Sequence, residues 1–259
     1  MNEDRFQKAL SSLPLGGLHY YETTGSTNDK ALTWASEGAS DLSLVIADEQ
    51  TAGRGRSGRK WYTPAGSGLA ISLILRPSPA EMKHPARITG LGALAVRDAL
   101  RTLGLTPQIK WPNDVLINGR KVAGILVESD WLGNNLHASI LGLGVNVLKV
   151  STPPAKFTAF PASCIEVELG HPPDRIELLK EILSALIKWR KKIGWEEFIQ
   201  TWQDSLAFRG QLVQVTRDSE TSINGELIGL EQNGNLLIRS QDGNLHQIQF
   251  GKIHHRPAL

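Results

Sequence analysis

The sequence has little cysteine, no long apolar run and no large excess of one charge. One cysteine, Cys164, occurs among 259 residues, which excludes an internal disulfide and favours a reducing compartment. No apolar run approaches the length of a membrane span, and the charged stretch 1–13 lacks the apolar segment of a signal peptide. We therefore expect a cytoplasmic protein without a membrane partner.

Charge is balanced over the chain but concentrated in one segment. Lys and Arg number 28 and Asp and Glu 26, so the formal net charge of +2 is not that of a polycation that seeks nucleic acid. Residues 53–60, however, contain three glycines, no acid and four cations, which are Arg54, Arg56, Arg59 and Lys60. Arginine side chains bind phosphate oxygens in pairs, so this segment is interpreted as an anion-binding loop. The alternative is a solvated basic loop, the usual role of a short charge run.

The apolar periodicity predicts a domain of helices and strands followed by a small β module. Helices are expected at 3–12, 26–38, 85–104, 175–194 and 195–208, and strands at 17–23, 42–50, 68–75 and 137–147. Asn118-Gly119 indicates a hairpin between two apolar runs. The proline-containing segment 149–172 is expected to be irregular, with at most a short strand.

The character of the sequence changes near Arg209. From there on, short apolar runs alternate with Asn-Gly and Asp-Gly turns, which is typical of a small β-barrel. The predicted fold class is therefore α+β, with a mixed-sheet domain over 1–207 and the barrel over 208–259.

Two nucleotide-binding motifs are approximated by the cationic loop. Gly53 to Gly58 satisfies G-x-G-x-x-G after a predicted strand, but that fingerprint requires a helix to begin at the glycines. In a P-loop, Arg59 would have to be lysine and Lys60 would have to carry a hydroxyl. The next predicted element is a strand, so both interpretations are rejected.

Two further strings place polar residues on otherwise apolar strands. In KWPNDV, Pro112 removes a backbone donor and interrupts the strand, which exposes Asn113 and Asp114. In GRKVAGILVE, Lys121 opens an apolar strand beside small residues that leave room close to the backbone. The alternative for this lysine is a solvated position at the end of a hairpin.

Five strings together resemble the biotin–protein ligases and occur in that family's order. They are STN (26–28), DEQTAGRGRSGRKW (48–61), KWPNDV (110–115), GRKVAGILVE (119–128) and GLGVNV (142–147). The resemblance implies a mixed-sheet catalytic domain of the biotin/lipoate ligase type with a C-terminal SH3-like β-barrel. It also implies that the protein activates biotin with ATP to biotinyl-5′-AMP and transfers biotin to a lysine of a biotin carboxyl carrier domain. A lipoate-type acyl ligase of the same fold is the alternative.

The resemblance further implies roles for individual residues. Lys121 and Arg56 are expected to be catalytic. The implied biotin-binding residues are Ser26, Thr27, Asn28, Gln50, Arg54, Gly55, Arg56 and Lys121, and the implied ATP-binding residues are Arg59, Trp61, Asn113 and Asn146. Three alternatives stay open: Ser26 or Thr27 as a helix N-cap, Trp61 as a core residue, and Asp114 as a turn residue in place of a group that orients Lys121 or the incoming acceptor lysine.

The remaining expectations concern metal and partners. No carboxylate or histidine cluster has metal-ligand spacing, so Mg²⁺ is expected to arrive on the triphosphate of ATP. Some family members carry an N-terminal helix-turn-helix domain; the 25 residues before Ser26 are too few for it, so we expect the short form that does not bind DNA. A nucleic-acid-binding role for residues 54–60 is disfavoured by the near-neutral net charge. A homodimer is compatible with the resemblance.

Overall fold

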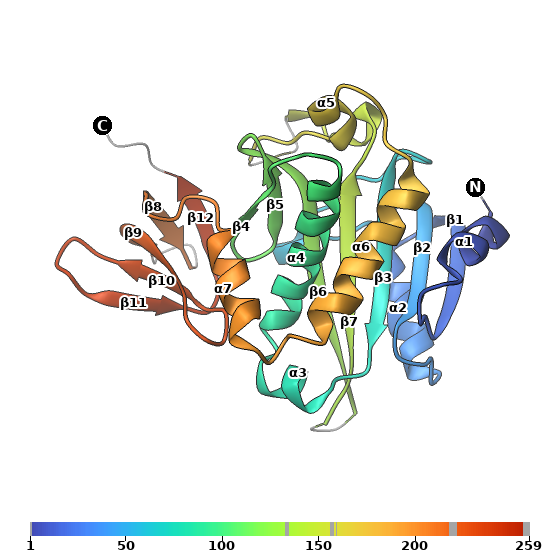
Figure 1. Ribbon diagram of the computed structural model, residues 1–259, viewed down its shortest axis with the longest axis horizontal. Helices are drawn as coiled ribbons and strands as arrows, with labels where there is room; N and C mark the ends of the chain where they lie inside the picture. The colour runs from blue at the N-terminus through green and yellow to red at the C-terminus, as the bar shows by residue number, and fades with distance from the viewer. Residues whose placement is uncertain (1, 133–134, 156–157, 159, 218–221, 256–259) are drawn as a thin grey trace.

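The computed structural model describes residues 2–132, 135–155, 158, 160–217 and 222–255, and Figure 1 labels its elements. The helices are α1 (Glu3–Leu10), α2 (Thr27–Ser36), α3 (Pro79–Lys83), α4 (Arg87–Thr102), α5 (Ile165–Leu169), α6 (Arg175–Arg190) and α7 (Glu196–Asp204). The first strands are β1 (Gly17–Thr24), β2 (Ser43–Gln50), β3 (Gly68–Leu75), β4 (Gln108–Lys110), β5 (Asp114–Ile117), β6 (Arg120–Leu132) and β7 (Asn135–Asn146). The last strands are β8 (Leu212–Thr216), β9 (Ser222–Leu230), β10 (Leu236–Arg239), β11 (Leu245–Ile248) and β12 (Lys252–His255).

The first seven strands form one mixed sheet in the order β1-β2-β3-β7-β6-β5-β4. β1 and β2 are parallel because α2 connects them as a crossover, whereas the other described neighbours in this sheet are antiparallel. Asn118 and Gly119, with φ of 49° and 69°, form the turn between β5 and β6, as predicted. The interruption expected at Pro112 separates β4 from β5.

Helices cover the two faces of this sheet unequally. α4 and α6 lie across one face and enclose the main apolar core (Figure 1). α2 covers part of the opposite face, where it packs on β2, β3 and β7. Because side chains alternate along a strand, Leu141 and Leu143 enter the main core while Gly142, between them, faces α2. The sheet surface next to the N-terminus of α2 therefore remains available for a site.

Local sequence signals explain how the long helices begin and pack. Asp174 accepts hydrogen bonds from the backbone N–H groups of Ile176 at 2.7 Å and Glu177 at 3.2 Å, which caps the N-terminus of α6. In α4, a Cβ atom at Gly90 would lie 2.5 Å from the Trp202 ring, so glycine permits the close approach of α7. These contacts fix the helical layer behind the sheet.

The last five strands form a separate antiparallel sheet in the order β11-β10-β9-β8-β12. Within the described residues this sheet is open, with β11 and β12 at its edges. Two hydrogen bonds connect this sheet to the first part of the chain. Trp111 Nε1, between β4 and β5, donates to the carbonyl oxygen of Gly234 at 3.0 Å, and the backbone N–H of Leu230 donates to Gln203 of α7 at 2.9 Å. The α+β class, with a mixed sheet and a C-terminal β module, is confirmed, and the domain boundary at 207/208 stays a prediction.

Two short helices are absent from the sequence-based prediction. α3 begins with a capping box, in which Ser78 accepts from the backbone of Glu81 at 3.3 Å and Glu81 accepts from the backbone of Ser78 at 2.7 Å. α5 lies within the segment 149–172, which was expected to be irregular, and it ends at Gly170 with φ of 84°. Both helices are too short to show a clear apolar period. No helix among the described residues is long and apolar enough to cross a membrane.

Asp48, near the end of β2, links β2 to β1 and α6 through hydrogen bonds. We expect its contribution to stability to be lost in acid. Tyr20 Oη and Arg175 Nη2 each donate to its carboxylate at 2.7 Å. Burial acts to raise the pKa of Asp48, but the hydrogen bonds from Tyr20 and Arg175 lower it below its ordinary value of 3.8. Burial and the bond to Asp48 raise the pKa of Tyr20 to about 12.

We expect Asp48→Asn to flatten the acid limb of the stability profile. A carboxylate with a lowered folded-state pKa contributes stability that is present above 3.8 and is lost as the pH falls through that folded-state pKa. Urea unfolding between about pH 6 and about pH 2 measures this. The exposed Asp4→Asn is the control and should keep the slope of the parent. An unchanged slope in Asp48→Asn would contradict the assignment.

Candidate active site

Small residues form a floor on the α2 face of the sheet. The register aligns Ala70 of β3 with Gly144 of β7 and Gly124 of β6, and Ser72 with Gly142 one row further. These five residues lie on the same face of the sheet, because successive residues of a strand face opposite sides. Here other side chains can approach the backbone of three adjacent strands.

Two predicted site residues lie directly on this floor. A Cβ atom at Gly144 would be 2.3 Å from Trp61 Cε2, and one at Gly142 would be 2.3 Å from Asn28 Oδ1. The ring of Trp61 also lies against Gly124, since a Cβ there would be 3.0 Å from Cζ3. Glycine is therefore required for the observed packing at both positions of β7.

Four predicted biotin-binding residues meet at the N-terminus of α2. Ser26, Thr27 and Asn28 are each 3% exposed. Gln50 Oε1, from the end of β2, accepts from Thr27 N at 2.8 Å and from Thr27 Oγ1 at 3.1 Å. Ser26 occupies the N-cap position of α2, as the alternative predicted, but its hydroxyl makes no capping hydrogen bond. Ser72, which was not predicted to belong to the site, joins this group because its Oγ atom lies 2.8 Å from Thr27 Oγ1.

Lys121 lies on the other side of Trp61 and is paired with a carboxylate. Its Nζ atom lies 2.5 Å from Asp114 Oδ1 and 5.3 Å from the centre of the Trp61 ring. The Nζ atom of a second cation, Lys110, lies 4.0 Å from Asp114 Oδ2. Burial lowers the pKa of Lys110, and the charge of Asp114 opposes this effect. Asp114 and Lys121 thus form an ion pair, and two cations share one anion.

Arg56 reaches this group from the cationic loop. Its Nη1 donates to Asn113 Oδ1 at 3.3 Å, and Asn113 Nδ2 donates to the carbonyl oxygen of Ile125 at 2.8 Å. Burial lowers the pKa of Arg56, and the nearby charge of Arg59 adds to this effect, while Asp114 opposes it. Arg59 itself is exposed. A half-buried guanidinium next to a neutral amide is well placed to bind an incoming anion.

The cationic loop is a hairpin, and two of its glycines take part in the backbone hydrogen bonds that pair its arms. Gly53 O accepts from Trp61 N at 2.8 Å and Gly55 N donates to Arg59 O at 2.7 Å, so the two arms pair. A Cβ at Gly53 would lie 2.6 Å from Trp61 O. The turn contains Gly58 with φ of 70°, and the next long element is β3. The rejection of a nucleotide-binding loop followed by a helix is therefore confirmed.

Arg54 and Asn146 lie at the border of the group. Arg54 Nη2 lies 2.6 Å from Asp29 Oδ1 and 3.1 Å from Glu128 Oε2, and the hydrogen bond that Arg54 donates to Asp29 raises the pKa of Arg54. Asn146, 3% exposed at the end of β7, donates to Ser163 O at 3.0 Å. Its amide therefore ties the chain beside Lys121, whose backbone N–H and C=O bond to residues 161 and 163.

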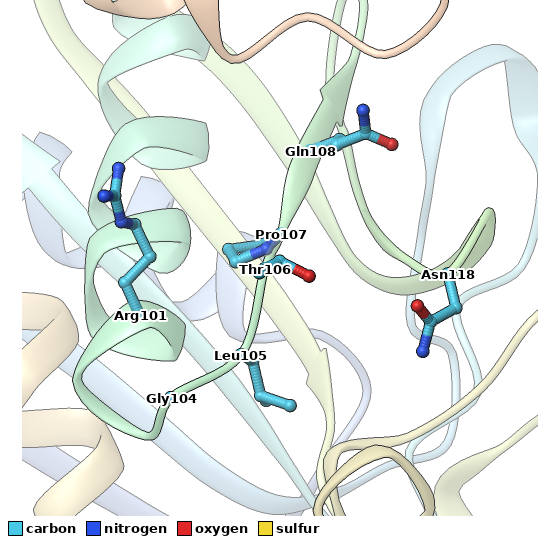
Figure 2. A pocket seen from close by; sticks show the side chains of 7 residues that line it. All are labelled: Arg101, Gly104, Leu105, Thr106, Pro107, Gln108 and Asn118. Atoms are coloured by element: carbon cyan, nitrogen blue, oxygen red, sulfur yellow. The ribbon is translucent and has the colours of Figure 1, made fainter.

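The hollows on the surface involve mostly other residues. Figure 2 shows one of about 540 Å³ near the C-terminus of α4; it is lined by Arg101, Gly104, Leu105, Thr106, Pro107, Gln108 and Asn118. The predicted site residues do not line it. A smaller hollow of about 150 Å³ borders on Arg56, Trp111 and Trp202, next to the C-terminal sheet.

Known proteins share this arrangement of strings and elements. The biotin/lipoate A/B protein ligase family matches residues 20–146. A protein from Paracoccus denitrificans named biotin–[acetyl-CoA-carboxylase] ligase is 37% identical over 230 residues, which cover 85% of this chain and 93% of that relative. The chain belongs to the biotin/lipoate A/B protein ligase family.

Other members of the ligase family are similar over nearly the whole chain. The bifunctional ligase/repressor BirA of Bacillus spizizenii is 33% identical over 248 residues, which cover 94% of this chain and 76% of that protein. The structure of biotin protein ligase from Aquifex aeolicus in complex with biotin and ATP is 29% identical, with a TM-score of 0.79 over 93% of this chain and 99% of that chain. The ligase-family resemblance of the five strings is thus confirmed.

Proposed function

We propose that this protein is a biotin–protein ligase, an enzyme that converts biotin and ATP to biotinyl-5′-AMP and then transfers biotin to a carrier lysine. The observation that carries the proposal is that Lys121 lies at the glycine floor beside a buried polar cluster, while Arg56 lies within electrostatic reach of Asp114, the partner of Lys121. The high identity to a relative named biotin–[acetyl-CoA-carboxylase] ligase supports it. The polar cluster is defined as Ser26, Thr27, Asn28 and Gln50 together with Ser72.

The polar cluster suits the ureido ring of biotin. That ring presents one carbonyl oxygen and two N–H groups, so its site must offer both donors and acceptors. Hydroxyl groups of Ser26 and Thr27 and the amides of Asn28 and Gln50 supply both kinds. The flat floor at Gly142 and Gly144 admits a fused ring close to the sheet.

The first half-reaction requires cations between two anions. A carboxylate oxygen of biotin attacks the α-phosphorus of ATP, the bond to the bridging oxygen breaks, and pyrophosphate leaves. Lys121 would neutralise the carboxylate and the α-phosphate together, while Arg56 would hold the adenylate; fixed charges aimed at the transition state are a large term in such reactions. Asp114, at 2.5 Å from Lys121, would orient its ammonium group.

The residues around Lys121 and Arg56 are proposed to bind ATP. Arg59, exposed on the loop, is proposed to meet the phosphates, while Trp61, Asn113 and Asn146 are proposed to line the adenosine side. Mg²⁺ carried by the triphosphate would offset phosphate charge. In the second half-reaction the carrier lysine amine attacks the acyl carbon, an amide forms, and AMP leaves.

The lipoate-type alternative fits the polar cluster less well. A dithiolane ring has neither an N–H group nor a carbonyl, so the buried polar groups would lose hydrogen-bond partners on binding. Unpaired buried polar groups cost free energy, typically about 1–3 kcal/mol each. Biotin is therefore the favoured substrate.

Biotin-dependent release of pyrophosphate from ATP tests the proposed function. We expect release with biotin and not with lipoate, followed by transfer of biotin to a biotin carboxyl carrier domain. A carrier whose acceptor lysine is replaced by arginine is the control and should stay unlabelled. Release that depends on lipoate and not on biotin would establish the alternative.

The other partner assignments are predictions with direct tests. A gel shift at physiological salt should show no specific DNA complex, and sedimentation should reveal whether the protein forms a homodimer. Cell fractionation should place the protein in the cytoplasm.

A further inference from the structure

One carboxylate on β6 contacts both the polar cluster and the cationic loop. Glu128 lies on the same face of β6 as Gly124, because the two positions differ by an even number of residues. It accepts hydrogen bonds from Asn28 Nδ2 at 2.5 Å and from Arg54 Nη2 at 3.1 Å. Its side chain is 30% exposed, which places these contacts at the rim of the site.

The contact with Asn28 determines how its amide is oriented. Carboxylate oxygens only accept, so Glu128 requires the NH₂ group of Asn28, and the amide oxygen then lies 2.6 Å from Ser72 Oγ. Ser72 continues to Thr27 at 2.8 Å, and Thr27 continues to Gln50 at 3.1 Å. A series of close polar contacts thus runs from Glu128 to Gln50, in which the single protons of Ser72 and Thr27 serve two of the three contacts made by these hydroxyls at any one time. The orientation of Asn28 limits which donors and acceptors a ligand ring can meet.

The contact with Arg54 fastens the loop to two separate elements. Asp29 comes from α2 and Glu128 from β6, and both carboxylates lie within 3.1 Å of the Arg54 guanidinium. We call Asp29, Arg54 and Glu128 the rim triad. Because Arg54 stands in the hairpin of residues 53–60, the rim triad holds this hairpin against the edge of the polar cluster.

We propose that Glu128 is a positioning residue with two separable effects, and the proposal rests on the proposed function. Through Asn28 it fixes the hydrogen-bonding pattern that receives the ring of biotin. Through Arg54, together with Asp29, it holds the loop against the edge of the polar cluster and retards loss of the adenylate. Glu128 pairs with Asn28 and Arg54 and not with Lys121 or Arg56, the residues proposed to meet the carboxylate and the phosphate, so it acts on binding and retention.

Glu128→Gln tests both effects, because it keeps the shape and replaces one acceptor with a donor. We expect the KM for biotin to rise about tenfold, the loss that follows from a hydrogen bond to a charged group, with little change in kcat. We also expect faster tryptic cleavage after Arg54, Arg56, Arg59 or Lys60 in the protein without ligand. Cleavage sites are identified by mass spectrometry.

Asp29→Asn separates the two effects. It weakens the rim triad but keeps the bond between Asn28 and Glu128, so cleavage and adenylate release should rise while the KM for biotin stays near that of the parent. Its side chain is 54% exposed, which favours a folded variant. Glu197→Gln, in the surface pair with Lys192 at 2.7 Å, is the matched control and should behave as the parent in all assays.

The outcomes distinguish this inference from the proposed function. An active parent whose Glu128→Gln variant has unchanged biotin KM and unchanged cleavage would overturn the positioning role and leave the ligase assignment intact. A parent without biotin-dependent pyrophosphate release would overturn the ligase assignment, while tryptic cleavage would still test the rim triad. An equal rise of biotin KM in Asp29→Asn and Glu128→Gln would overturn the separation of the two effects.

Discussion

Replacing Lys121 with alanine is expected to lower biotin-dependent ATP–pyrophosphate exchange by at least about a hundredfold. The Lys121 ammonium group lies 2.5 Å from Asp114 and beside the Trp61 ring, on the strand that carries the glycine floor. Without it, the carboxylate of biotin and the α-phosphate would approach each other with their repulsion uncompensated. In addition, Asp114 would keep its negative charge next to the reacting groups.

The same experiment needs evidence that the variant is folded. Arg120→Ala removes the adjacent cation of β6, whose guanidinium pairs with Glu168 at 2.7 Å away from the site, and it should retain exchange. Lys121→Ala should melt close to the parent, whereas Arg120→Ala should melt lower, because the Glu168 side chain is 1% exposed and loses its cation. If a folded Lys121→Ala protein exchanged pyrophosphate at nearly the parental rate, Lys121 would not be the group that brings the two anions together.

Local features of this fold were predictable because they depend on neighbours in the sequence. Pro112 ends β4 and leaves Asp114 to begin β5, and Asn118-Gly119 supplies the two positive φ angles of a tight hairpin. The strand 68–75 was predicted with its observed bounds, since a continuous apolar run between glycine and proline has few other conformations.

Long-range partners could not be predicted in this way. Ser72 interrupts an apolar strand without any local sign of a role, and it reaches Asn28 and Thr27 only because β3 pairs with β7 in one particular register. A shift by one residue would turn Ser72 towards the main core. Glu128 belongs to a string that resembles the ligases, but its partners Asn28 and Arg54 lie 100 and 74 positions away in the sequence. They belong to α2 and to the loop, and these elements meet only through tertiary packing.

The cationic loop illustrates the same limit. Four neighbouring cations predict anion binding, yet only the fold assigns them different environments. Arg54 already has two carboxylate partners, whereas the hydrogen bond of Arg56 within the described residues goes to the neutral amide oxygen of Asn113. Burial lowers the pKa of Arg56, which means that its charge is poorly compensated in this state. An incoming phosphate would supply the missing partner, so Arg56 is the loop cation that we expect to hold the adenylate.

Arg56→Gly is therefore expected to release biotinyl-5′-AMP at least about tenfold faster than the parent, because a hydrogen bond between charged groups is lost. The affinity for biotin should fall less, since the polar cluster is intact. The freed adenylate would react with amines in solution, so biotin should appear on a bystander such as serum albumin. Lys60→Gly introduces the same backbone freedom in the same hairpin but removes an exposed cation, and it should label the bystander no more than the parent does. Equal labelling by Arg56→Gly and Lys60→Gly would mean that loop flexibility, and not the Arg56 guanidinium, controls retention of the intermediate.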